Sequence, residues 1–250
     1  MTDAAPPSAP GGPHRPNGRS LVTPTTATGA SPRPADASTA APVVPASGPL
    51  PRLDRPARSA LHAELPSTAA LALARAPGHA LELALVRGAT PELEALVGWE
   101  FRGINTTPEG APPIARLAGI QKFVKGMFRS NDGRAMGYNT PVVQNVLDGR
   151  WQPRPSDAEP KRFGFYSVAP VDPTSRDNHY LHALLIDYSK GGNPAWNITR
   201  GLRDYLVQVD AGNPDLFLGK AYAAIGPARV ALGYFVLERW RRGPASVLRR

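Results

Sequence analysis

From Trp99 onward, apolar and polar residues alternate with a period of two in eight runs separated by clusters of Gly, Pro, Asn and Asp. This alternation is typical of half-buried β-strands, and turn-type residues between the runs favour antiparallel connections. A parallel sheet would need helical crossovers, for which only PPIARLAG and TPVVQNVLDG could serve. The eight runs are WEFRGIN, QKFVKGMFR, RAMGYN, RFGFYSVAPV, HYLHALLIDYS, RDYLVQVD, DLFLGKAYAAI and RVALGYFVLERW.

Eight antiparallel strands can close into a barrel, and closure removes the exposed sheet edges that promote aggregation. We therefore expect a mainly β fold, an antiparallel barrel of eight to ten strands over residues 98–242. The interior of a barrel of this size is filled by side chains or holds one small ligand. The sequence leaves both alternatives open.

The aromatic residues set the domain boundaries. Every Phe, Trp and Tyr lies between Trp99 and Trp240, so the main core must lie there. Residues 1–56 hold 13 of the 29 prolines, and we expect a disordered Pro/Ala/Ser/Thr-rich tail. Residues 57–97 are rich in Ala and Leu and predict one or two helices, with Thr90 as an N-cap, Pro91 as the first helical residue and Gly98 as the stop. Residues 243–250 form a basic tail.

Composition limits the chemistry. The chain has no cysteine, which removes disulfides and thiolate metal sites, and it shows neither a secretory signal nor a membrane-spanning run, so we expect a protein of the cytoplasm without membrane insertion. Arg outnumbers Lys 24 to 5, and Ala and Pro are abundant, which indicates a bacterial genome of high GC content. Neither a cofactor nor a metal is expected. The net charge is +9, but the arginines near the C-terminus have only Trp240 among them, which favours a solvated basic end over a specific nucleic-acid site. These arginines are Arg239, Arg241, Arg242, Arg249 and Arg250.

The run DLFLGKAY raises the question of what the barrel encloses. One face would carry Phe217, Gly219 and Ala221, and the small residues leave room for a ligand. In the alternative, another aromatic side chain fills that room. Lys220 on the other face either extends outward or meets an acidic ligand group.

The last forty residues carry a family resemblance. They contain an Asp-Tyr-hydrophobic-x-x-Val-Asp strand, then a Leu-Gly strand, then a Phe-hydrophobic-Leu-x-Arg strand, and the chain resembles calycin or lipocalin-like small barrels, most closely uncharacterised bacterial proteins of the GXWXG type. The resemblance implies that the first and last strands are adjacent, with Trp99 or Phe101 stacked on Arg239 or Arg241. The matching positions are Asp204, Tyr205, Val209, Asp210, Leu218, Gly219, Phe235, Leu237, Glu238 and Arg239.

These observations lead to a ligand-binding hypothesis. We expect a lipocalin-like barrel that binds a small hydrophobic or amphipathic molecule, with the lining chosen among Tyr180, Tyr205, Phe217, Lys220, Tyr222 and Tyr234. One alternative is a cyclase or isomerase of secondary metabolism that uses the same cavity, with His182 or a tyrosine as its proton donor, although a hydrogen-bonded core histidine would also explain His182. The other is a solid barrel that acts as a protein-interaction module. Residues 57–97 could also mediate a homodimer.

Overall fold

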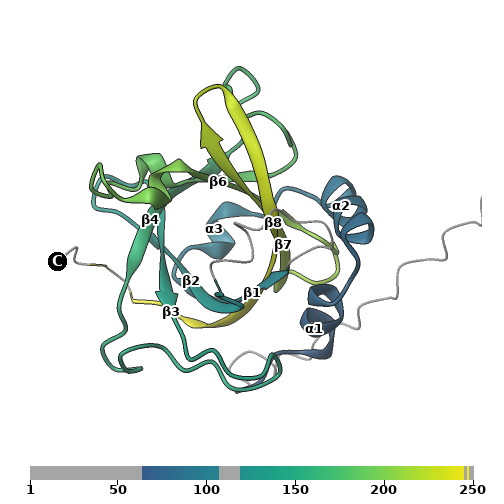
Figure 1. Cartoon of the computed structure of the whole chain (residues 1–250), viewed down its shortest axis with the longest axis vertical. Helices are drawn as coiled ribbons and strands as arrows, with labels where there is room; N and C mark the ends of the chain where they lie inside the picture. Colours follow the sequence, from purple (N-terminus) through teal and green to yellow (C-terminus); the bar gives the residue numbers. More distant parts are fainter. Residues whose placement is uncertain (1–63, 107–118, 245–246, 248–250) are drawn as a thin grey trace, which may run out of the picture. The chain divides into compact units, whose positions relative to one another are not determined.

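The fold is a closed barrel of eight antiparallel strands in sequential order, so the predicted mainly β architecture is confirmed (Figure 1). The computed structural model describes residues 64–106, 119–244 and 247. β1 pairs with both β2 and β8, and this pairing closes the barrel. The strands are β1 (Trp99–Thr106), β2 (Lys122–Arg129), β3 (Ala135–Pro141), β4 (Phe163–Pro170), β5 (Leu184–Asp187), β6 (Leu202–Gln208), β7 (Leu216–Ile225) and β8 (Ala228–Arg242).

β5 is shorter than its sequence pattern predicts. The run from His179 was expected to be extended throughout, but only Leu184–Asp187 forms a strand. Asp187 ends it, because its side chain accepts a hydrogen bond from the backbone N–H of Ser189 at 2.9 Å and caps a 3₁₀ turn, η2 (Tyr188–Lys190). A second 3₁₀ turn, η3 (Ile198–Gly201), leads into β6.

Three helices precede the barrel: α1 (Thr68–Ala74), α2 (Gly78–Arg87) and α3 (Leu93–Leu96). α1 and α2 lie against the outer wall at β7 and β8, whereas α3 closes one end of the barrel, where Leu96 is 1% exposed among the interior side chains (Figure 1). We call this end the base and the opposite end the mouth. The predicted cap at Thr90 is wrong, because Glu92 precedes α3 and Ala89 pairs with Gln208 of β6. Gly98 does follow the helical turn, with a φ of 81°.

The two faces of β7 divide as the alternation predicts. Phe217 and Ala221 pack with the interior cluster, and Leu216, Leu218 and Tyr222 pack with the cluster formed by α1, α2 and the outer wall. The outer wall at β7 and β8 is therefore a second hydrophobic layer covered by helices.

Aromatic rings fill the space that the inward-facing glycines leave. A Cβ atom on Gly219 would lie 2.0 Å from the ring of Phe235, and one on Gly103 would lie 2.2 Å from the ring of Phe123. The two rings are 6.1 Å apart and in edge-to-face contact. Of the two alternatives for Gly219, the structure therefore shows the one in which another aromatic residue takes the room.

A cation–π cluster closes the base. The guanidinium of Arg239 lies 4.8 Å from the ring centroid of Trp99 and 5.6 Å from that of Phe101. It also donates to Asp215 Oδ1 and to the carbonyl oxygen of Ala95, both at 2.6 Å. The adjacency of the first and last strands and the stacking of an aromatic residue on Arg239 are thus both observed.

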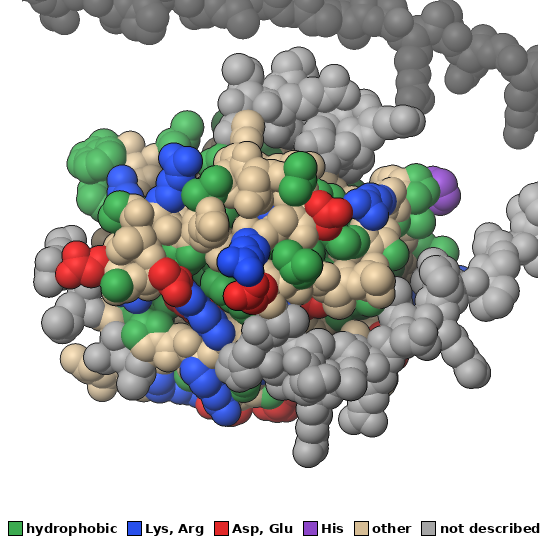
Figure 2. All heavy atoms as spheres, turned by 90° about the horizontal axis from the view of Figure 1, so that it is seen from below, with side chains coloured by type: hydrophobic (Ala, Val, Ile, Leu, Met, Phe, Trp, Pro, Cys, Tyr) green, Lys and Arg blue, Asp and Glu red, His purple; other side chains and the backbone are tan. Residues whose placement is uncertain are grey.

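The sequence suggested that the arginines near the C-terminus are solvated, but those at the end of β8 make specific contacts. Arg239 is 7% exposed, Arg241 donates to Glu100 Oε2 at 2.7 Å, and Arg242 stacks on Trp99 with 3.9 Å to the ring centroid. These contacts join the end of β8 to β1 and so stabilise the closed barrel. On the face shown in Figure 2, basic side chains are interspersed with acidic ones.

Two of the domains predicted from the sequence lie wholly or mostly outside the residues that the structure describes. The proposed tail over residues 1–56 lies outside the described residues, as does most of the basic tail over 243–250. None of the described helices is by itself long and apolar enough to cross a bilayer.

Replacing Arg239 with Met should destabilise the protein by about 2 to 4 kcal/mol, because both the aromatic stacking and the charged hydrogen bonds are lost. Urea denaturation measures the change. Arg134→Met is the control, since Arg134 pairs with Asp132 on the surface and its loss should change stability by about 1 kcal/mol or less. Equal effects of the two substitutions would contradict this role of Arg239.

Candidate functional site

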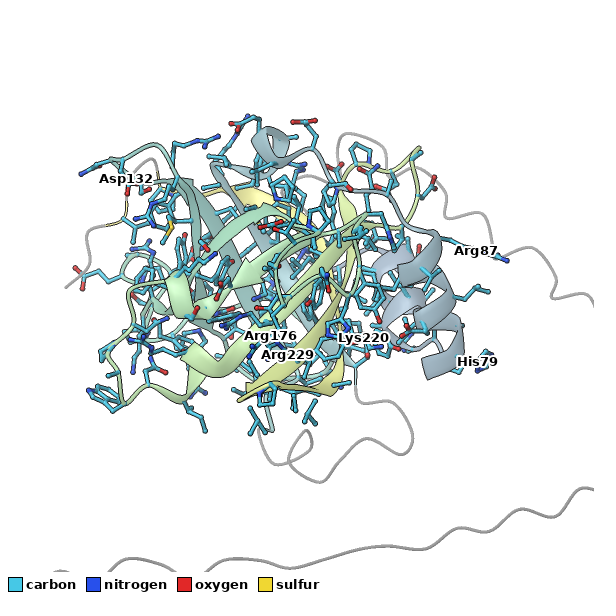
Figure 3. The ribbon with its side chains drawn as sticks, turned by 90° about the horizontal axis from the view of Figure 1, so that it is seen from above. His79, Arg87, Asp132, Arg176, Lys220 and Arg229 are labelled. Atoms are coloured by element: carbon cyan, nitrogen blue, oxygen red, sulfur yellow. The ribbon has the colours of Figure 1, made fainter. Side chains whose placement is uncertain are left out.

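Four of the predicted ligand-binding residues, Tyr180, Lys220, Tyr222 and Tyr234, do come together, but on the outer wall of the barrel. They meet Glu82 of α2, which the sequence analysis did not single out. Figure 3 shows Lys220 on the side of the barrel that faces α2, the helix that carries the labelled His79 and Arg87.

The carboxylate of Glu82 is the centre of this outer cluster. It accepts hydrogen bonds from Lys220 Nζ at 2.7 Å, from the Tyr180 hydroxyl at 2.9 Å and from the Tyr234 hydroxyl. The ammonium of Lys220 also lies 5.3 to 5.6 Å from the ring centroids of Tyr180, Tyr222 and Tyr234. Of the two alternatives for Lys220, the structure shows the outward one. The cluster fixes α2 to the barrel.

The electrostatics of the outer cluster favour its charged form. Burial raises the pKa of Glu82, but the hydrogen bonds from Lys220, Tyr234 and Tyr180 outweigh burial and hold this pKa below its usual value. Burial lowers the pKa of Lys220, yet its contact with Glu82 leaves that pKa above the usual value. The pKa values of the Tyr180 and Tyr234 hydroxyls are raised, mainly by burial.

The other predicted residues are divided between the two sides of the wall. Tyr205 is fully buried outside the barrel, edge-to-face with Tyr180 and Tyr222, and burial raises the pKa of its hydroxyl to about 12. Phe217 alone of the set points into the interior. His182 does not line the barrel, because it precedes β5 and its Nε2 lies 3.0 Å from the carbonyl oxygen of Leu85 in α2.

The interior contains a polar network that sequence reasoning missed. Lys125 of β2 and Asp204 of β6 form an ion pair, with Nζ and Oδ2 separated by 3.2 Å. Lys125 Nζ also donates to the Tyr188 hydroxyl at 2.5 Å and to Asn139 Oδ1 at 3.2 Å, and the Tyr188 hydroxyl donates to Asp204 Oδ2 at 3.2 Å. We call these four residues the interior network.

Aromatic rings surround the ammonium of Lys125. Its Nζ lies 4.6 Å from the ring centroid of Tyr166, 5.0 Å from Tyr188, 5.3 Å from Phe235 and 5.7 Å from Phe123. These distances are within the range of cation–π attraction. The aromatic rings therefore form a cage for a cation inside the barrel.

Burying this ion pair is energetically costly. The side chains of Lys125 and Asp204 are 2% and 5% exposed. Burial lowers the pKa of Lys125 and raises that of Asp204, while their mutual attraction opposes both shifts. Well-packed hydrophobic residues often stabilise a core as well as a buried ion pair does. Ionisable groups with perturbed pKa values cluster at functional sites, so the interior network is the candidate functional site.

One sequence signal could have found this network. Lys125 lies in KFVKGMF at the same parity as Phe123, on the face that alternation assigns to the interior. A lysine on an inward face needs a partner, but Asp204 is 79 residues away and only barrel closure brings the two together.

Within the described ranges, no group of three or more His, Asp and Glu side chains is arranged to hold a metal ion. No protein-family model matches this sequence, and a search of curated proteins finds no significant match. The structure itself therefore defines the class as a closed eight-stranded antiparallel barrel with a caged ion pair inside.

The outer cluster should make the protein sensitive to acid. A carboxylate whose pKa is depressed on folding stabilises the protein above its unfolded pKa, 4.5 for Glu82, and this contribution is lost as the pH falls through the folded pKa. Between pH 5 and pH 3, the unfolding free energy of Glu82→Gln should therefore fall less than that of the wild type. The difference should be about 1 kcal/mol or less, because the side chain of Glu82 is partly exposed and its ion pair is screened by solvent. Urea denaturation from pH 3 to 7 tests this. The exposed Glu159→Gln serves as the control and should retain the wild-type slope.

The interior network should show strong coupling. Lys125→Met should destabilise the barrel by about 3 to 5 kcal/mol, because it leaves the carboxylate of Asp204 buried and unpaired, and adding Asp204→Leu should restore most of that loss. Lys220→Met, at an ion pair on the outer wall, should cost less. Denaturation of the three variants measures these differences. If the double variant were no more stable than Lys125→Met, the two residues would not act as a pair.

Proposed function

We propose that the barrel binds a small amphipathic molecule that carries an acidic group, and that Lys125 receives this group. The caged ion pair of Lys125 and Asp204 supports the proposal. Small-molecule sites typically combine apolar and aromatic walls with a few convergent polar groups. The interior network has this composition.

The chemistry of the pair suits exchange with a ligand. A ligand carboxylate that reaches Lys125 would replace Asp204 as the counter-ion, and Asp204 would then take up a proton. Burial already raises the pKa of Asp204, so this proton uptake is favoured over that of an ordinary aspartate. Binding should therefore tighten as the pH falls.

The rings on the mouth side of Lys125 are the groups that a ligand would displace. Phe123 and Phe235 lie there, and each rests on a glycine of a neighbouring strand. Nearer the mouth, the inward positions Ala221 and Gly233 are small and partly exposed. Rotation of the two phenylalanines would connect this end to the interior network.

The packed interior favours the solid-barrel alternative. The rings of Phe217, Phe235 and Tyr166 are at most 2% exposed, and they fill the barrel together with the ion pair. A barrel that stays filled would act through its outer surface, as a protein-interaction module. For the enzyme alternative, His182 is an unfavourable proton donor, because it lies on the outer wall and not in the barrel interior.

Displacement of a fluorescent long-chain carboxylate from the full chain tests the proposal, with native mass spectrometry as a check for co-purified ligand. The double variant Lys125→Met with Asp204→Leu should weaken binding at least about tenfold, because a carboxylate then has no cationic partner. Lys220→Met is the matched control, a lysine among tyrosine rings on the outer wall, and should bind like the wild type. For the wild type, affinity should rise from pH 8 to pH 5. Absence of binding, or equal binding by the double variant, would favour the solid barrel.

A further inference from the structure

Exposed large hydrophobic side chains gather at the mouth of the barrel. Within the described part of the chain, six of the nine such residues lie on segments at this end, and the other three, Leu65, Val86 and Leu181, lie elsewhere. We call the six the apolar rim: Ile120 (46% exposed), Val146 (69%), Trp196 (85%), Ile198 (89%), Ile225 (64%) and Val230 (39%).

Strand direction places the apolar rim at the mouth. Ile120 comes just before β2 and Val146 follows β3, at the end where β1 finishes. Trp196 and Ile198 lie in the connection from β5 to β6, and Ile225 ends β7. In an antiparallel barrel these strand ends meet on one side, opposite the end that α3 covers.

Several separate segments carry the rim, which favours a deformable surface as its occupant. Trp196 and Ile198 are almost fully exposed, and keeping such side chains in water is unfavourable by about 25 cal/mol per Å² of apolar area. A bilayer interface accepts single side chains from several loops, and Trp is enriched at that depth.

Charges beside the rim complement an anionic surface. Lys190 and Arg200 flank Trp196 and Ile198 in the same connection, and the side chain of Lys190 is 69% exposed. The one acidic residue in residues 187–201, Asp187, is buried and pairs with Arg203 at 3.1 Å as well as with Lys190 at 3.7 Å. The segment is therefore net basic, and each Lys or Arg near an anionic bilayer contributes about 1 kcal/mol of attraction.

We infer that the apolar rim docks onto an anionic lipid surface, with Trp196 and Ile198 inserted among the headgroups and Lys190 and Arg200 facing the lipid charges. This orientation turns the mouth toward the bilayer. The inference rests on the proposed function only where it names the lipid layer as the source of the amphipathic ligand. The docking itself requires no ligand.

Co-sedimentation of the full chain with vesicles tests the inference. Vesicles of equal parts phosphatidylserine and phosphatidylcholine should bind the protein, and vesicles of phosphatidylcholine alone should bind it more weakly. Replacing Trp196 and Ile198 with Ser should lower the partition coefficient at least about tenfold. The control replaces Val86 and Leu181 with Ser, two exposed apolar residues outside the rim, and should bind like the wild type.

Three outcomes would overturn the inference: no binding to anionic vesicles, equal loss in the rim and control variants, or a concentration-dependent dimer in sedimentation velocity that the rim substitutions abolish. The last outcome would assign the rim to contact between copies of the chain. The two proposals can fail separately. The rim variant should still bind the carboxylate probe in solution, and the double variant at Lys125 and Asp204 should still bind vesicles.

Discussion

The pairing of β1 with β8 is the interaction on which the rest of the structure depends. It converts a meander with two open edges into a barrel, so that each strand acquires an inner and an outer face. Arg239 reinforces the closure by joining β8 to the Trp99 and Phe101 rings of β1, to Asp215 and to the end of α3. Without this closure, neither the interior network nor the covered outer wall would exist.

Closure creates two different environments for similar residues. Lys125 and Lys220 each have a carboxylate partner and tyrosine rings close to the ammonium group. On the outer wall, Lys220 and Glu82 remain partly solvated, and their contact raises the pKa of the lysine while it fixes a helix. Inside the barrel, burial dominates and lowers the pKa of Lys125. The same chemistry is structural in one place and a candidate binding site in the other.

The proposed ligand site lies inside the barrel, and the apolar rim lies at the mouth, the end from which a ligand would reach that site. The base is closed by α3 and Arg239, so exchange with the interior would have to occur at the mouth. That end carries the small inward residues Ala221 and Gly233 as well as the most exposed apolar side chains, Trp196 and Ile198. A barrel that takes an amphipathic molecule from a lipid layer would need both features at the same end.

The sequence by itself determined the antiparallel direction of the strands and the face of β7 that turns inward, because alternation with a period of two is a local property of the chain. The stacking of Trp99 or Phe101 on Arg239 or Arg241 was expected from the family resemblance, and the structure shows it at Arg239. The sequence did not determine that Phe235 would fill the space above Gly219, or that Tyr180 and Lys220 would bind Glu82 of α2 outside the barrel. Nor did the sequence determine that Lys125 would pair with Asp204. These contacts join residues far apart in sequence, and only the closed barrel, with its fixed register and helical cover, decided which of them meet.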